Sequence, residues 1–178
     1  MKILYDTEFI ERGPKFPIDF VSIGMVAEDG RELYAVNADM DQDLVRTHPF
    51  VGKHVWPQLP LVQPRPGYRG GSHPRLDLDH PDVRPDAQIA RLISDFVQRT
   101  PDPELWAWYG GYDHVVLAQR FGTMAQLPGH IPMFTNDLKQ EAARQGNPRL
   151  PEQQSGAHNA LADARHNLTR ARALNLLD

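Results

Sequence analysis

The apolar positions of the first third of the chain fall into short runs that are typical of β-strands. Strands are predicted at residues 2–5, 18–26 and 32–36. The triplet EDG at residues 28–30 separates the second run from the third and is a signal for a hairpin turn. We therefore expect these three strands to form an antiparallel meander.

The second half of the chain alternates amphipathic helices with strands. Four helices are expected, at residues 86–99, 112–121, 135–145 and 158–176. Two strands lie between them, at residues 105–109 and 131–134. Thr135 is expected to cap the third helix, and Gly146 to end it. The meander followed by helix, strand, helix, strand, helix predicts an α/β fold, with a mixed sheet and helices on both faces.

The segment between residues 37 and 85 is rich in proline and glycine and lacks regular hydrophobic periodicity. A short helix is expected near residues 41–47, and the rest is expected to be irregular. The segment also carries Arg65, Arg69, Arg75 and Arg84. Two interpretations stay open, a solvated loop or a substrate flap or subunit arm. We expect one domain over residues 1–178, with a Pro/Arg-rich irregular insertion at about 48–85.

Composition narrows the class of protein. The 178 residues are 40% hydrophobic, and no apolar run approaches the roughly 20 residues of a membrane span. The N-terminal MKILYDTEFIE turns acidic at once and is typical of a strand rather than a signal peptide, so we expect a cytoplasmic protein. The absence of cysteine excludes disulfides and thiolate zinc sites. A net charge of −4 argues against coating nucleic acid, but it allows a site that grips a chain end.

Three carboxylates follow predicted strands, at positions where α/β proteins commonly bind ligands. Asp6 and Glu8 are two residues apart at the end of the first predicted strand and therefore share a face. Two such carboxylates repel unless a cation lies between them. Asp113 follows a strand and two glycines, at the sheet edge where ligands bind in α/β proteins. The alternatives are that the pair is exposed on the surface and that Asp113 caps a helix.

The stretch HNALADARHN, residues 158–167, opens the last predicted helix with His158 and Asp163. Five residues on a straight helix turn about 500°, so the two side chains would point about 140° apart. They can meet only if His158 precedes the helix and reaches over from the loop. Asp163 would then suit a metal ligand and His158 a proton acceptor. The alternatives are a histidine bonded to a nearby carbonyl and an exposed first-turn acid favoured by the helix dipole.

These motifs together resemble the DEDDh branch of the 3′–5′ exonucleases, whose fold is ribonuclease H-like. The resemblance extends from YDTEFIE to HNALADARHN, nearly the whole chain. The stretches WAWYGGYDHVVL and HNALADARHN look most similar to small actinobacterial exoribonucleases that prefer polyadenylate and form homodimers. The resemblance implies an enzyme that removes nucleoside 5′-monophosphates from RNA 3′ ends, with an adenylate-rich RNA as partner and a homodimer as its assembly.

The resemblance also implies a role for each motif residue. Asp6, Glu8, Asp113 and Asp163 match the four acids that bind two Mg²⁺ or Mn²⁺ ions, which favour hard oxygen ligands. Asp6 is the expected bridging ligand of a two-metal hydrolysis. His158 matches the general base, which must be neutral to accept a proton.

Substrate contacts are implied for Asp6, Thr7, Glu8 and Phe9, with Phe9 stacking on or wedging against the terminal base. Phe9 could equally be a core aromatic residue. Two other functions stay open at this point. One is a DNA exonuclease or an oligoribonuclease with the same site. The other is a catalytically idle domain that binds RNA ends or a protein partner.

Overall fold

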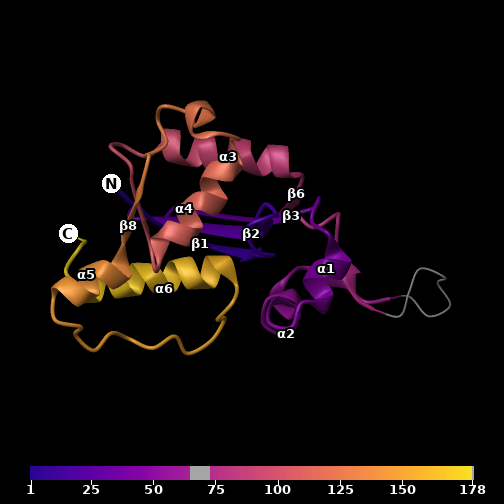
Figure 1. Cartoon of the computed structure of the whole chain (residues 1–178). Coiled ribbons are helices and arrows are strands. Elements are labelled where there is room, and N and C mark those ends of the chain that lie inside the picture. Colours follow the sequence, from indigo (N-terminus) through magenta and orange to yellow (C-terminus); the bar gives the residue numbers. More distant parts are fainter. Residues whose placement is uncertain (65–72, 178) are drawn as a thin grey trace.

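A six-stranded mixed sheet forms the centre of the molecule (Figure 1). The computed structural model describes residues 1–64 and 73–177. The strands follow the order β6-β3-β2-β1-β7-β8 across the sheet. Their bounds are β1 Lys2–Ile10, β2 Asp19–Ala27, β3 Glu32–Asn37, β6 Val83–Arg84, β7 Glu104–Ala107 and β8 Thr135–Asp137. The predicted antiparallel meander of β1, β2 and β3 is confirmed, and β7 and β8 extend the sheet in parallel from β1.

Helices cover both faces of this sheet, as predicted (Figure 1). One face carries α3 (Asp86–Gln98) and α4 (Gly110–Gln119), and the other carries α5 (Leu138–Arg144) and α6 (Ala160–Ala173). The pleat of β1 explains this layering. Ile3 and Tyr5 pack into the same buried cluster as residues of α3 and α4, whereas Leu4 packs with α5 and α6. None of the helices in the two described ranges has the length and apolar character needed to span a membrane.

The insertion between β3 and α3 consists of short elements that pack on the rest of the protein through buried apolar side chains. These elements are α1 (Gln42–Thr47), α2 (Val51–His54), a 3₁₀ turn (Trp56–Gln58), β4 (Leu61–Val62) and β5 (Arg75–Leu76). The short helix predicted near 41–47 is confirmed, and Asp41 caps it. Much of the rest is irregular, as expected, but Val51, Val55 and Trp56 are buried in a cluster with residues of β2 and β3. Arg65 and Arg69 lie outside the described residues.

Two predicted strand bounds were wrong near the acids. The first strand was expected at residues 2–5, but β1 continues to Ile10, so Asp6 and Glu8 lie within it. Polar residues interrupt the apolar pattern there because they line a site rather than face solvent. β7 ends at Ala107, and Tyr109 adopts a left-handed φ of 61° that turns the chain into α4. The helix predicted at 112–121 therefore begins and ends two residues earlier.

The strand predicted at residues 131–134 is also wrong. β8 is formed instead by Thr135–Asp137, whose polar sequence TND gives no apolar signal. Asp137, not Thr135, caps α5, because its side chain accepts hydrogen bonds from the backbone of Lys139 and Gln140. The last helix begins at Ala160 and ends at Ala173, inside the predicted bounds of 158–176, and a 3₁₀ turn (Met124–Gln126) precedes β8.

Candidate active site

Asp6 and Glu8 lie on the face of β1 that α6 covers. Glu8 is buried, with 9% of its surface exposed, and Asp6 is half-buried. Burial is the largest cause that raises the pKa of both carboxyls, and the negative charge of Asp163, on α6, raises both further, so the two side chains share this neighbour. The interpretation of this pair as exposed surface acids is therefore wrong. A register shift in the pairing of β1 with β2 follows immediately, between Glu8 and Phe9.

Gly24 lets α6 approach the sheet beside these acids. In the ladder between β1 and β2, Gly24 is the partner of Asp6. A Cβ atom on Gly24 would overlap the backbone of Ala160 and Leu161, so the first turn of α6 lies directly on β2. Further along α6, the buried Asn167 donates a hydrogen bond of 3.1 Å from Nδ2 to the Tyr5 carbonyl. These two contacts fix the height and the rotation of α6 above Asp6.

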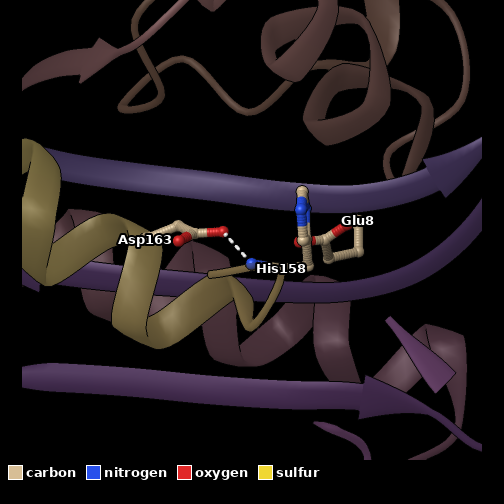
Figure 2. Close-up of side chains that lie close together, drawn as sticks. All are labelled: Glu8, His158 and Asp163. Atoms are coloured by element: carbon tan, nitrogen blue, oxygen red, sulfur yellow. Dashed lines mark hydrogen bonds between the residues drawn. The ribbon is translucent and has the colours of Figure 1, made fainter. Parts of the chain in front are cut away.

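The segment before α6 places His158 next to Asp163 (Figure 2). Asn159 caps the helix by accepting from Ala162 N at 3.1 Å, and His158 stands one residue earlier. The His158 backbone N donates to Asp163 Oδ2 at 2.9 Å, and Gln153 Nε2 donates to Asp163 Oδ1 at 2.6 Å. The prediction that His158 precedes the helix and reaches over Asp163 is thus confirmed. Asp163 is half-buried and bonded, so its interpretation as an exposed first-turn acid is wrong.

Glu8, His158 and Asp163 form a compact group of possible ligands. One carboxylate oxygen from each acid and one imidazole nitrogen lie within 4.8 Å of one another (Figure 2). The three residues come from β1, the loop before α6 and α6 itself. This spacing matches a set of atoms that can surround a single cation.

Asp113 lies outside this group of three and approaches Asp6 and Glu8 from the opposite face of the sheet, close enough for its charge to raise the pKa of both carboxyls. It is buried, with 5% exposed, and its Oδ1 accepts from Thr7 N at 2.9 Å and from Thr7 Oγ1 at 2.6 Å. Tyr109 occupies the N-cap position of α4, so the interpretation of Asp113 as a helix cap is wrong. The two hydrogen bonds from Thr7 instead connect Asp113, and with it α4, to the middle of β1.

The four carboxyls share one electrostatic environment. Burial raises the pKa of Asp6 well above its ordinary value, and the charges of Asp113, Glu8 and Asp163 raise it further. Burial and the charges of Asp163 and Asp113 raise the pKa of Glu8 to about 8. Burial raises the pKa of Asp113 to about 6, against the opposing hydrogen bonds from Thr7, and burial also raises the pKa of Asp163.

Such a cluster favours a bound cation, because positive charge relieves both the repulsion and the cost of burial. Its ligand atoms are hard carboxylate oxygens, which fit Mg²⁺ or Mn²⁺ better than a soft metal.

Arg170 is a site residue that the sequence did not indicate. Its positive charge lowers the pKa of Asp6 and of Asp163, opposing the stronger effect of burial. The guanidinium is half-buried, lies 4.3 Å from the centroid of the Trp108 ring and donates to Asn167 Oδ1 at 3.0 Å. Its spacing along α6, seven residues after Asp163, is the only signal that could have placed it on the same face.

Two of the four residues predicted to contact substrate, Thr7 and Phe9, are engaged within the protein. The Thr7 hydroxyl is bonded to Asp113, and Phe9 is partly buried against the cluster that α3 and α4 form with the sheet. The core interpretation of Phe9 is therefore supported, and a stacking role for its exposed part stays a prediction.

The central strand and the flanking helices bring four carboxyls together beside a histidine. This arrangement is typical of phosphate-ester hydrolases that use metal ions. No protein-family model matches the chain. It is, however, 41% identical over 178 residues to curated 3′–5′ exoribonucleases of two strains of Mycobacterium tuberculosis, and the match covers 100% of this chain and 95% of each relative. The chain therefore belongs to the family of these 3′–5′ exoribonucleases, and it is an enzyme of that family.

Proposed function

We propose that this enzyme is a metal-dependent 3′–5′ exoribonuclease of the DEDDh type with a ribonuclease H-like fold. It hydrolyses the last phosphodiester of an RNA and releases a nucleoside 5′-monophosphate, with adenylate-rich 3′ ends preferred. One observation carries the proposal: carboxyls from β1, α4 and α6 meet in one site, where the charges of Asp113 and Asp163 raise the pKa of both Asp6 and Glu8. The full-length similarity to proteins named 3′–5′ exoribonucleases supports the reaction class.

Asp6, Glu8, Asp113 and Asp163 would hold two Mg²⁺ or Mn²⁺ ions. When bound, such ions lower the pKa of the attacking water and stabilise the charge that develops on the phosphate. Asp6 would be a central ligand of these ions, because the charges of the other three acids all act on its carboxyl. Glu8 and Asp163 lie near His158 on one side, and Asp113 is held by Thr7 on the other.

His158 would act as the general base. Its imidazole accepts the proton of the water that adds to phosphorus, the bond to the 3′-oxygen of the shortened RNA breaks, and that oxygen takes up a proton. The backbone bond to Asp163 holds the residue where its ring reaches the acids. A ligand role for the His158 ring is the second candidate, because the ring lies within 4.8 Å of two carboxylate oxygens.

The two roles of His158 predict different outcomes for His158→Ala. A general base predicts a loss of turnover of about 10² to 10⁴ with Mn²⁺ affinity retained. A ligand predicts a loss of Mn²⁺ affinity as well. His130→Ala serves as the control, because His130 hydrogen-bonds to Ser94 and lies before β8, outside the acid cluster.

We also propose that Thr7, Glu8 and Phe9, together with Asp6, contact the terminal nucleotide, and that the enzyme is a homodimer. Light scattering at several protein concentrations tests the dimer: a mass of one chain, 20.2 kDa, throughout would refute it.

A time course on 5′-labelled RNA tests the reaction. An A-tailed RNA, a U-tailed RNA and a matching DNA are incubated with Mg²⁺ and, separately, with EDTA. We expect a metal-dependent ladder of single-nucleotide steps that forms fastest on the A-tail. Equal rates on both RNA tails would remove the adenylate preference. A ladder on DNA would favour a DNA exonuclease, and no cleavage of any substrate would favour an idle binding domain.

A further inference from the structure

The insertion between β3 and α3 places two aromatic rings against His158. The Phe50 ring lies 5.1 Å from the His158 ring, centroid to centroid, at an angle of 88°. The His54 ring lies 5.3 Å from His158 and 4.8 Å from Phe50. Phe50 is the N-cap residue of α2 and His54 is its last residue, so one short helix supplies both rings. Figure 1 shows α2 beyond the N-terminal end of α6.

The backbone that carries these rings is firmly anchored. Val51 and Val55 are buried in the cluster that the insertion forms with β2 and β3. The Val51 backbone N donates to His48 Nδ1 at 3.1 Å, and a Cβ atom on Gly52 would overlap the Arg46 carbonyl, so α2 packs tightly on α1. Phe50 nevertheless leaves 51% of its surface exposed, which means that its ring adds little to this buried anchor.

His158 needs support of this kind. Its φ of 67° lies in the left-handed region, which costs a non-glycine residue on the order of 1–3 kcal/mol and persists only where its surroundings hold it. Its backbone N is bonded to Asp163. Among residues 1–64 and 73–177, however, no hydrogen bond reaches either ring nitrogen of His158. Packing against Phe50 and His54 therefore restricts the rotation of the ring.

We propose that Phe50 and His54 are positioning residues, which hold the His158 imidazole in the orientation that accepts a proton from the attacking water. This inference rests on the proposed general-base role of His158. The nearly perpendicular arrangement of the Phe50 and His158 rings is a favourable geometry for an aromatic pair. The insertion is then part of the active site, because Phe50 and His54 pack directly against the proposed general base, His158.

A double-mutant cycle tests the proposal on the full-length enzyme with A-tailed RNA. Phe50→Ala is expected to lower kcat about tenfold and to change KM less than twofold, because an aromatic pair contributes up to about a factor of ten. In a His158→Ala background, single-turnover rates with excess enzyme should show no further loss from Phe50→Ala. His54→Phe, which keeps a ring at that position, should retain most of the activity that His54→Ala loses.

Phe134→Ala is the matched control, since Phe134 is also an exposed phenylalanine, at 64%. Thr135 pairs with Leu105, and Leu105 pairs with Ile3. Phe134 therefore lies level with the N-terminal end of β1, whereas Glu8 lies near the C-terminal end of that strand. Its substitution should leave kcat unchanged.

Three outcomes would overturn the inference. A loss from Phe50→Ala that persists without His158, or that appears in KM, would mean that Phe50 contacts RNA. Equal losses from His54→Phe and His54→Ala would mean that ring packing is not the role of His54. Full activity of Phe50→Ala would remove its role altogether. These outcomes require an active parent enzyme. An inactive parent would instead overturn the proposed function, and the inference with it.

Discussion

Substitution of Glu8 by glutamine is expected to stabilise the metal-free protein while abolishing its activity. Burial and the charges of Asp163 and Asp113 raise the pKa of Glu8 from its ordinary value of 4.5 to about 8. A group whose pKa is raised by folding favours the folded state below its unfolded pKa, and this contribution is lost as the pH rises through the folded pKa. Glu8 therefore takes up a proton on folding at neutral pH, and glutamine resembles that protonated form.

The magnitude follows from the same two values. At pH 7 the uptake of a proton by a group with an unfolded pKa near 4.5 costs roughly 3 kcal/mol, and at pH 5 it costs under about 1 kcal/mol. Glu8→Gln removes this cost. For a chain of 178 residues, 3 kcal/mol corresponds to a rise in Tm of about 6–12 °C at pH 7, with a rise of only about 1–4 °C at pH 5.

Thermal unfolding in EDTA at the two pH values measures the effect, and Glu141→Gln is the control of opposite sign. Arg144 and Gln145 lower the pKa of Glu141 to about 2, so its ionised form favours folding and its substitution should not raise Tm. Excess Mn²⁺ should then stabilise the parent more than Glu8→Gln, because the variant lacks a ligand. A Tm change for Glu8→Gln that is equal at both pH values, or negative at pH 7, would refute the electrostatic reasoning.

Three further substitutions test the architecture of the site. Asp163→Asn should weaken Mn²⁺ binding in calorimetric titrations, and a titration identical to that of the parent would refute a ligand role. Asn159→Ala removes the cap of α6, so chemical denaturation should show a loss of about 1 kcal/mol, which Asn159→Asp should largely restore. Gly24→Ala forces a Cβ atom into the backbone of α6, so unfolding should show a loss of about 1–3 kcal/mol, and RNA hydrolysis should fall even where the variant is folded. Gly129→Ala, where a Cβ atom would meet nothing within 4 Å, should change neither property.

The acids could be predicted from the sequence because each stands at a marked position. Asp6 and Glu8 interrupt an otherwise apolar strand, and Asp113 follows two glycines where a strand turns into a helix. The spacing of His158 and Asp163 required a loop before the helix, and the structure has one. Hydrophobic periodicity likewise predicted the meander and the helices on both faces, since those elements bury one side.

The remaining features depend on contacts that no local pattern reveals. Gly24 shows its role only once α6 lies on β2. Phe50 and His54 belong to a short helix in a Pro-rich segment, and only the folded insertion brings them to His158. β8 is a polar strand, and its position is determined by its pairing with β7 and by the capping of α5. A search for apolar runs therefore placed this strand several residues too early, at 131–134.

The pairing of β1 with α6 has a consequence for biosynthesis. Asp6 lies on the first strand, and Asp163 lies on the last helix to emerge from the ribosome among the described elements. A nascent chain that has completed β1 to β8 still lacks Asp163 and His158, so the proposed mechanism predicts that it does not attack the message that encodes it or the RNA of the ribosome. On the proposed mechanism, catalytic competence is acquired only when α6 docks on Gly24, and truncated chains that end before His158 should be inert towards RNA.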